Sequence, residues 1–219
     1  MAEIRNSKAQ KPLVTDLYSL YLEMEGHLLQ DVHPSDYLNG IYDHPLFRQY
    51  PFDMLHKLKQ TMQSPKHHPE GNVWNHTLLV VDEAAKVKSE SKNPRVFLWA
   101  ALLHDIGKAS TTKHRKGKIT SYNHDKVGAV LARDFLAQFT EDYRFIDEIC
   151  GLIRYHMQIL FVVNNLPFVD IDGMKRHTDI HEIALFSLCD RLGRLNSNPK
   201  EERKHIKQFL QACGSVVLD

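Results

Sequence analysis

Apolar residues recur every three or four positions along most of this chain, which is the spacing of one face of an α-helix. No segment alternates between apolar and polar residues in the way that marks a half-buried strand. The pattern therefore predicts an all-α fold in which residues 110–123 and 164–175 are loops, the second a candidate lid. The predicted helices cover residues 15–30, 37–41, 52–61, 72–88, 94–106, 124–139, 142–157, 179–195 and 201–213.

Residues at the ends of these segments predict how the helices begin and stop. Thr15 or Asp16 is expected to cap the first helix, and Asn123 is expected to cap the helix that starts beside it. Gly107 is expected to end a helix, because glycine readily takes the left-handed conformation found just beyond many helix C-termini. The helix over residues 179–195 is apolar nearly all round, so we expect it to be the buried central helix of the fold.

Length and composition describe an ordinary globular protein. The chain has 219 residues, 42% hydrophobic and 25% charged, which is enough for one sizeable domain with its own core. A net charge of +1 gives no overall attraction to nucleic acid or to an anionic membrane. The three cysteines stand far apart, the N-terminus has no apolar signal segment, and no apolar run is long enough to cross a bilayer. We therefore expect a cytoplasmic protein that does not enter membranes, with a disordered segment over residues 1–11.

Four residues far apart in the chain carry the chemistry. They are His76, the adjacent pair His104 and Asp105, and Asp190. Burying imidazole and carboxylate groups among apolar residues is costly unless the groups pair or bind a metal ion. The set contains no thiolate, which argues against a structural zinc site and suits Mn, Fe, Co, Ni or Zn at a catalytic site. Two further histidines at helix ends, His124 and His156, are candidate ligands as well, because helical proteins build metal sites from inward side chains of several helices.

With these residues in the order H…HD…D, and with Leu-Leu-His-Asp-Ile-Gly-Lys over residues 102–108, the chain resembles the HD superfamily of metal-dependent phosphohydrolases. Two flanking segments make the resemblance closer to the HD domain attached to bacterial CCA-adding tRNA nucleotidyltransferases. They are His-Pro-Glu-Gly-Asn-Val-Trp-Asn-His over residues 68–76 and Asp-Arg-Leu-Gly-Arg over residues 190–194. Too few residues precede His76 for us to expect the nucleotidyltransferase part as well.

The resemblance extends over roughly residues 65–195 and implies a domain organisation. It implies an HD-domain helical bundle over residues 66–213 with a metal site between its helices. Residues 1–65 are then expected to be an N-terminal helical extension that packs on this core.

The resemblance also implies a site with two divalent ions. The expected ligands of the first ion are His76, His104, Asp105 and Asp190, with Asp105 bridging to a second ion held by His124 and His156. Two ions about 3.5–4 Å apart activate a bridging hydroxide and clamp the phosphorus for in-line attack. Alternatively, His124 and His156 contact the substrate or support the ligands from behind.

Two cations follow the ligands at helical spacing. Lys108 stands three positions after Asp105 and Arg194 four positions after Asp190, so each can share a helical face with a ligand. We expect Lys108, together with Asp105, to act in catalysis, and Lys108 and Arg194 to bind the phosphoryl oxygens. Lys108 could instead be a helix C-terminal charge, and Arg194 could pair structurally with a carboxylate. The basic run over residues 113–118 is either a solvated turn or a rim that collects phosphate.

Together these features predict a metal-dependent phosphohydrolase, a phosphomonoesterase or phosphodiesterase, that acts on a nucleotide or on the phosphate at an RNA end. Alternative enzymes are a cyclic-dinucleotide phosphodiesterase and a nucleoside-polyphosphate pyrophosphohydrolase. An alternative of another class is a non-catalytic regulatory module that binds a metal ion and a nucleotide. The complete ligand set favours an enzyme. The identity of the metal, the physiological substrate and the oligomeric state stay open.

Overall fold

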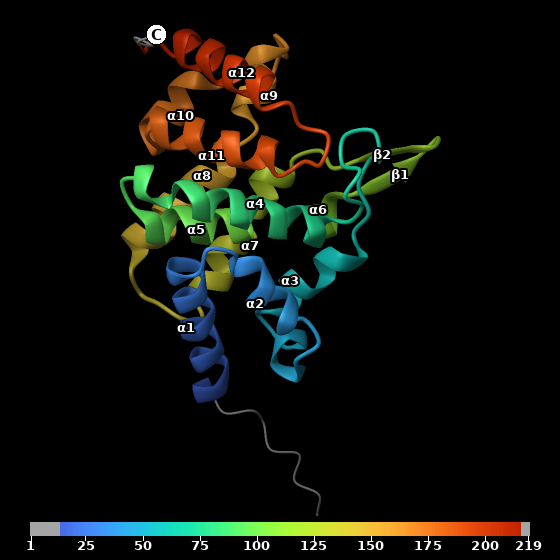
Figure 1. Cartoon of the computed structure of the whole chain (residues 1–219), viewed down its shortest axis with the longest axis vertical. Coiled ribbons are helices and arrows are strands. Elements are labelled where there is room, and N and C mark those ends of the chain that lie inside the picture. The colour runs from blue at the N-terminus through green and yellow to red at the C-terminus, as the bar shows by residue number, and fades with distance from the viewer. Residues whose placement is uncertain (1–13, 216–219) are drawn as a thin grey trace, which may run out of the picture.

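Helices account for most of the residues that the structure describes, so the predicted all-α fold is confirmed (Figure 1). The structure is a computed structural model that describes residues 14–215, and the disorder expected over residues 1–11 lies outside the described residues. The α-helices are α1 (Val14–Gln30), α2 (Pro34–Gly40), α3 (Asp53–His56), α4 (Val73–Val87), α5 (Pro94–Leu103), α6 (Lys108–Thr111), α7 (His124–Leu136), α8 (Tyr143–Tyr155), α9 (Gln158–Val163), α10 (Ile171–His177), α11 (Ile180–Leu192) and α12 (Pro199–Ala212). Short 3₁₀ helices cover Pro45–Arg48, Lys57–Gln60 and Lys88–Glu90, and two strands, β1 (Lys113–Arg115) and β2 (Lys118–Thr120), form an antiparallel hairpin.

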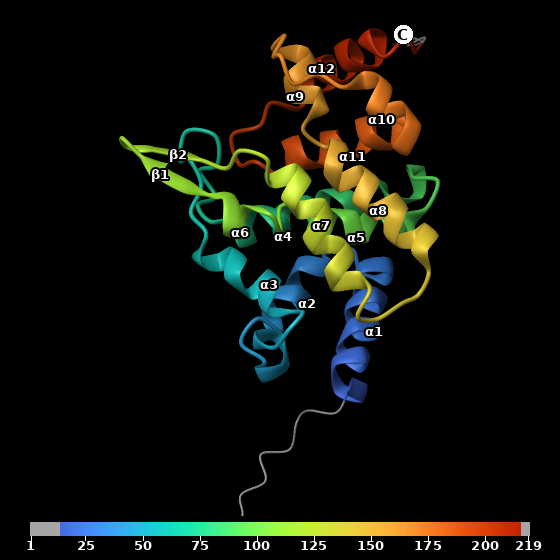
Figure 2. The ribbon, with the colours of Figure 1, turned by 180° about the vertical axis from the view of Figure 1, so that it is seen from behind.

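The helices stack in tiers along the longest axis of the molecule (Figure 1). α1, α2 and α3 lie toward one end, α4 and α5 lie in the middle, and α10, α11 and α12 lie toward the other end. α7 packs along α8 on the side that Figure 2 turns toward the viewer. The β1–β2 hairpin projects sideways from the middle tier, so it is the part of the fold that extends farthest from the helices (Figures 1 and 2).

α5 is the central helix, because every residue from Val96 to Leu103 is buried. Asn93 caps its start by accepting a hydrogen bond from the backbone N–H of Val96. The helix packs against α4, α8 and α11. The prediction that the segment 179–195 would form the central helix is therefore wrong. α11 lies over α5, and its outward residues, such as Leu185, are only half-buried.

One helix boundary and one predicted cap also differ from the prediction. α5 ends at Leu103 rather than at residue 106, and Gly107 has a right-handed φ of −68°, so it is not a left-handed helix terminator. Asn123 does precede α7 as predicted, but its own backbone is left-handed, with φ 61°, and its side chain makes no capping hydrogen bond. The position of Gly107 is explained by its close contact with α7, which local sequence rules do not describe.

The start of the first helix was also misplaced. α1 begins at Val14, so Thr15 and Asp16 lie inside its first turn and neither is its cap. At α8 the capping residue is the one expected from its chemistry. Asp142 caps α8 by accepting a hydrogen bond from the backbone N–H of Phe145.

Three elements lie in or beside segments that were predicted to be loops. The β1–β2 hairpin lies within residues 110–123, and its strands are too short to show an alternating pattern. α9 follows α8 after a break at His156 and Met157. α10 begins within residues 164–175, where Asp170 caps it by accepting a hydrogen bond from the backbone N–H of Gly173.

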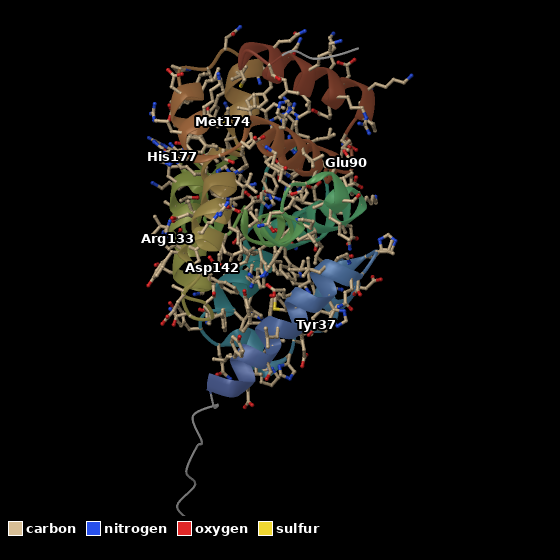
Figure 3. All side chains as sticks on the ribbon, turned by 90° about the vertical axis from the view of Figure 1, so that its left-hand side faces the viewer. Tyr37, Glu90, Arg133, Asp142, Met174 and His177 are labelled. Atoms are coloured by element: carbon tan, nitrogen blue, oxygen red, sulfur yellow. The ribbon has the colours of Figure 1, made fainter. Side chains whose placement is uncertain are left out.

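The buried apolar residues form one connected core. It reaches from Met24 of α1 and Leu38 of α2 to Phe209 of α12, so the helices before residue 65 pack into the same core as the rest. In the side view of Figure 3, Tyr37 of α2 lies toward one end of the molecule and Met174 of α10 toward the other. Among residues 14–215, no helix has both the length and the apolar character that crossing a bilayer would need.

Candidate metal centre

The first pair of candidate ligands joins α4 to α11. His76 lies in the first turn of α4, which Asn72 caps by accepting a hydrogen bond from the backbone N–H of Asn75. His76 is fully buried, and its Nε2 lies 3.0 Å from Oδ1 of Asp190 in α11. The two helices approach closely because residue 193 is glycine. A Cβ there would lie 2.6 Å from Cγ2 and 3.0 Å from the backbone nitrogen of Val80.

His104 and Asp105 bring a second helix end to the same place. Both residues follow α5 directly and are buried, as predicted for a polar pair that faces a gap between helices. Oδ2 of Asp105 lies 3.2 Å from Nε2 of His104 and 3.9 Å from Nε2 of His76. Its other oxygen, Oδ1, lies 3.5 Å from Nε2 of His124. The carboxylate of Asp105 therefore stands between two groups of histidines.

His124 and His156 form the other side of the cluster. His124 begins α7 and His156 follows the last residue of α8, and their Nε2 atoms are 3.2 Å apart. α7 comes near enough because residue 107 is glycine. A Cβ on Gly107 would lie 2.2 Å from the carbonyl oxygen of His124 and 2.6 Å from the backbone nitrogen of Gly128.

Backbone carbonyls fix the orientation of three of the histidines. In each case Nδ1 lies at hydrogen-bond distance from the carbonyl oxygen three residues earlier. The pairs are His104 with Ala101 (2.9 Å), His124 with Ser121 (2.6 Å) and His156 with Ile153 (2.7 Å). When Nδ1 donates its proton in this way, the neutral ring presents the lone pair of Nε2 to the centre of the cluster, which is the arrangement that metal-binding histidines adopt.

His76 is supported by residues that sequence reasoning missed. Oε1 of the buried Glu70 lies 3.0 Å from Nδ1 of His76 and 2.8 Å from Nδ1 of His68. A carboxylate behind a histidine orients the ring and makes it a more basic ligand. The available signal was position: Glu70 and His68 both lie in the segment before His76 that carried the resemblance.

The electrostatics of the cluster favour a bound cation. Burial alone would raise the pKa of Asp105 and of Asp190, yet nearby positive groups, Lys108 beside the first and Arg194 beside the second, help to hold both well below the ordinary value. Burial opposes protonation of His76, but hydrogen bonds to Asp190 and Glu70 raise its pKa, so negative potential surrounds its ring.

His124 and His156 are held in the neutral form. Burial lowers the pKa of His124 to about 4, and burial followed by repulsion from His104 lowers the pKa of His156. At neutral pH both rings are therefore unprotonated and can donate a lone pair.

The donor atoms group into two sets that fit metal ions. One set is His76, His104 and Asp190, the other is Asp105, His124 and His156, and within each set the ligand atoms lie within 4.8 Å of one another. Nε2 of His104 is buried and has no hydrogen-bond partner among residues 14–215. A buried acceptor without a partner is costly, and a metal ion at this position would satisfy it.

The two predicted phosphate-binding cations lie beside the cluster. Nζ of Lys108 lies 2.7 Å from Oδ2 of Asp105 and donates a hydrogen bond to Oε1 of Gln63 (2.6 Å). Lys108 is the first residue of the short helix α6, and its ammonium contacts side chains of Asp105 and Gln63. Nη2 of Arg194 lies 3.5 Å from Oδ2 of Asp190, so the alternative of structural pairing describes part of its environment.

The cluster lies at one wall of a cavity of about 690 Å³. Lys108 and Arg194 both line it, together with Asp105, Asp190, His124 and His156. The wall formed by the end of α8, α9 and the loop after it is largely apolar, with Leu160, Phe161, Leu166 and Phe168. The cavity therefore combines a cationic, carboxylate-rich end with an apolar side.

The sequence model of the HD domain family matches residues 73–195. This stretch is more than half of the chain and contains all six clustered residues. The chain belongs to the HD domain family. The residues that suggested the motif H…HD…D, namely His76, His104-Asp105 and Asp190, lie within the matched stretch, and the fold brings their side chains together.

Curated relatives of this HD domain carry the name Multifunctional CCA protein. The one from Halorhodospira halophila is 53% identical over 138 residues, which cover 60% of this chain and 32% of the relative. The one from Pasteurella multocida is 29% identical over 206 residues (90% and 48%), and the one from Teredinibacter turnerae is 26% identical over 197 residues (86% and 46%). The chain spans less than half the length of these relatives. Its HD domain is related to that of CCA-adding enzymes.

Membership of the HD family indicates a metal-dependent hydrolase superfamily, and the His and Asp clusters of this HD domain are suited to a divalent metal. Lys108, His124, His156 and Arg194 all lie within the matched residues. Glu70 and Gln63 precede them, so part of the support for the cluster comes from outside the segment that the family model matches.

Proposed function

We propose that this chain is a metal-dependent phosphohydrolase, a phosphomonoesterase or phosphodiesterase, that acts on a nucleotide or on the phosphate at an RNA end. The observation that carries the proposal is the convergence of four Nε2 atoms and two carboxylates in a cluster of which Asp105, Asp190, His124 and His156 line a cavity, together with Lys108 and Arg194. A site that only bound a metal would not need two cationic side chains that line the same cavity.

The proposed ligands divide between two divalent ions, Mn, Fe, Co, Ni or Zn. His76, His104 and Asp190 would hold one, His124 and His156 the other, and Asp105 would serve both through its two oxygens. Support for this division comes from the contacts of Asp105, whose Oδ2 faces His104 and whose Oδ1 faces His124. Metal ions bound here would lower the pKa of water and so supply hydroxide at neutral pH.

In this proposal Lys108 and Arg194 bind the phosphate of the substrate. Lys108 is held by Asp105 and Gln63, which fix its ammonium at the edge of the cluster instead of leaving it free in solvent. There it can neutralise charge that builds up on a phosphoryl oxygen. Arg194, about a quarter exposed and turned toward the cavity, can bind a second oxygen with its planar guanidinium.

The shape of the cavity supports a nucleotide substrate. A volume of about 690 Å³ is within the range of small-molecule sites, and its apolar wall can accept a base beside the bound phosphate. The names of the curated relatives, which refer to CCA, favour an RNA end within this class.

The proposed functional unit is the HD domain over residues 66–213, with residues 1–65 as an extension packed on it. Every proposed metal ligand lies in the HD domain, while Gln63 of the extension reaches Lys108. The three cysteines, Cys150, Cys189 and Cys213, are free and buried, which suits the reducing cytoplasm where we place this activity.

The test is hydrolysis after metal exchange. Metal-stripped protein receives Mn, Fe, Co, Ni or Zn and is offered a chromogenic phosphodiester, nucleoside mono- and triphosphates, cyclic mono- and dinucleotides, and short RNAs with a terminal phosphate. We expect turnover of a nucleotide or RNA-end phosphate that His104→Ala abolishes. His181→Ala, which changes an exposed histidine of α11, is the control and should keep full activity. A protein that binds metal but hydrolyses none of these compounds would be a regulatory module and would refute the proposal.

A further inference from the structure

The β1–β2 hairpin carries positive charge that nothing nearby balances. Lys113, Arg115, Lys116 and Lys118 are all exposed, and no aspartate or glutamate occurs in the sequence over residues 106–124. In the part of the chain that the structure describes, none of these four cations forms an ion pair. The whole chain has a net charge of only +1, so this is a local feature against a nearly neutral background.

The register of the hairpin sorts its side chains onto two faces. Lys113 pairs with Thr120 and Arg115 with Lys118, while His114 pairs with Ile119. Because neighbouring residues of a strand point to opposite faces, Lys113, Arg115 and Lys118 share one face, and Ile119 lies on the other. Ile119 lines the cavity of the proposed active site. The cations therefore lie on the face of the hairpin opposite to Ile119, and Lys118, which directly precedes Ile119 in β2, is the cation next in sequence to a residue that lines the cavity.

The turn of the hairpin fixes the register of the two strands. Lys116 and Gly117 both have positive φ, 49° and 72°, as the two central residues of a type I′ turn require. At the base of the hairpin, the hydroxyl oxygens of Thr112 and Ser121 are 2.7 Å apart, and this hydrogen bond joins the two segments that lead into and out of the hairpin. The projecting arm in Figure 1 is thus a defined hairpin and not an extended loop.

An aromatic side chain completes the surface. Tyr122 is 75% exposed and lines the same cavity as Ile119 and Ser121. Cations that follow a phosphate backbone, next to an exposed aromatic ring on which a base can stack, are the combination that binds single-stranded nucleic acid. The tip, Lys116-Gly117, has no apolar side chain, so the hairpin lacks the residues that insert into a lipid surface.

We propose that the β1–β2 hairpin binds the phosphate backbone of a single-stranded polynucleotide whose terminal nucleotide occupies the cavity. The proposal rests on the proposed phosphohydrolase function and narrows its substrate from free nucleotides to polynucleotide ends. In this arrangement the phosphates that follow the terminal nucleotide leave the cavity past Ile119 and Tyr122, cross the edge of the two-stranded hairpin and meet the long side chains of Lys113, Arg115 and Lys118 on its other face.

The first experiment measures binding apart from hydrolysis. Full-length, metal-loaded protein is titrated into a fluorescent single-stranded RNA without a terminal phosphate, and anisotropy is followed at several KCl concentrations. The variant K113Q/R115Q/K118Q removes the shared cationic face. The matched control K200Q/R203Q/K204Q removes two lysines and one arginine that are exposed on α12 and do not line the cavity.

Each phosphate contact on a single strand contributes about 0.7 to the slope of log affinity against log salt. If the three cations make one contact each, the hairpin variant should bind about a hundredfold more weakly near 0.1 M KCl, with a slope flatter by about two. The control should match the wild type. Wild-type affinity and slope in the hairpin variant would overturn the proposal, as would binding of the wild type to anionic vesicles but not to RNA.

A second experiment separates this proposal from the proposed function. Values of kcat/KM are compared for a mononucleotide and for an RNA with the same terminal nucleotide. We expect the hairpin variant to lose RNA turnover by a factor similar to its loss of binding and to keep mononucleotide turnover. Equal loss on both substrates would overturn the hairpin's role. If the wild type binds RNA through the hairpin but hydrolyses neither substrate, the hairpin surface stands and the phosphohydrolase function fails.

Discussion

Replacing Gly107 with alanine tests whether close contact between α6 and α7 assembles the site. A Cβ at this position would lie 2.2 Å from the carbonyl oxygen of His124 and 2.6 Å from the backbone nitrogen of Gly128. Both are backbone atoms, so no side-chain rotation can relieve the overlap, and α7 has to move as a unit. Overpacking a core costs about 1–3 kcal/mol, and we expect about 3 kcal/mol here for that reason. The φ of −68° suits alanine, so the cost is steric alone.

The assay is thermal unfolding followed by circular dichroism in the presence of EDTA, which removes the contribution of bound metal. For a domain of this size 1 kcal/mol corresponds to about 2–4 °C, so Gly107→Ala should lower Tm by about 6–12 °C. Gly26→Ala is the matched control. Gly26 lies inside α1, and a Cβ there would meet nothing within 4 Å, so this change should stabilise by about 0.5–1 kcal/mol through helix propensity. A Gly107→Ala protein that melts within about 2 °C of the wild type would refute the reasoning.

Three further predictions address single side chains. Lys108→Met should keep the metal content measured by elemental analysis but lower kcat by about 10²-fold, and wild-type kcat would remove Lys108 from the phosphate site. Glu70→Gln should weaken metal binding about 10- to 100-fold in a calorimetric titration while helical content stays constant, because His76 loses its carboxylate support. Asp179→Ala removes the cap of α11 and should cost about 1 kcal/mol at pH 7 in a thermal melt. Burial would raise the pKa of Asp179, but Lys92 and backbone N–H donors lower it, so its stabilisation is present above the unfolded pKa of about 3.9 and is lost as pH falls further. The difference between this variant and the wild type should therefore shrink below about pH 4, and a constant difference would contradict the assignment.

The helices that the sequence predicted well are those defined by local chemistry. The helix expected over residues 72–88 is Val73–Val87, and the helix expected over residues 142–157 is Tyr143–Tyr155. Each has an apolar face and a capping residue at its start, so short-range physics specifies both its period and its boundary. The choice of the central helix failed because it depends on which neighbours cover a helix. α5 is enclosed by α1, α4, α8 and α11, and the sequence of α5 alone does not say so.

The six candidate metal ligands could be predicted from the sequence by their residue type, their order and their position at helix ends. The fold does bring all six side chains together. Their geometry could not be derived in the same way. The two glycines that permit the close approaches, Gly107 and Gly193, do so through contacts with residues 124–128 and with Val80. Gly107 was interpreted as a helix terminator because local rules offer only conformational reasons for a glycine. Close contact between helices is a second reason, and it becomes visible only when both helices are placed.

Glu70 shows why the support for a metal site is harder to infer than its ligands. It stands six residues before His76, which is no helical spacing, and it lies in the loop before α4, so helical periodicity does not connect the two residues. The loop between Met62 and Asn72 connects them. Met62 and Asn72 form an antiparallel bridge that closes this loop, and Nδ2 of Asn75 donates a hydrogen bond to the carbonyl oxygen of Glu70 (2.9 Å). These contacts turn the carboxylate back onto Nδ1 of His76. The same loop carries Gln63 to Lys108, so one closed loop contacts both His76, a proposed metal ligand, and Lys108, the proposed phosphate-binding cation. Because this loop contacts both His76 and Lys108, opening it with Asn75→Ala should lower both metal affinity and kcat. Glu70→Gln should lower mainly metal affinity, because the carboxylate that it changes contacts His76.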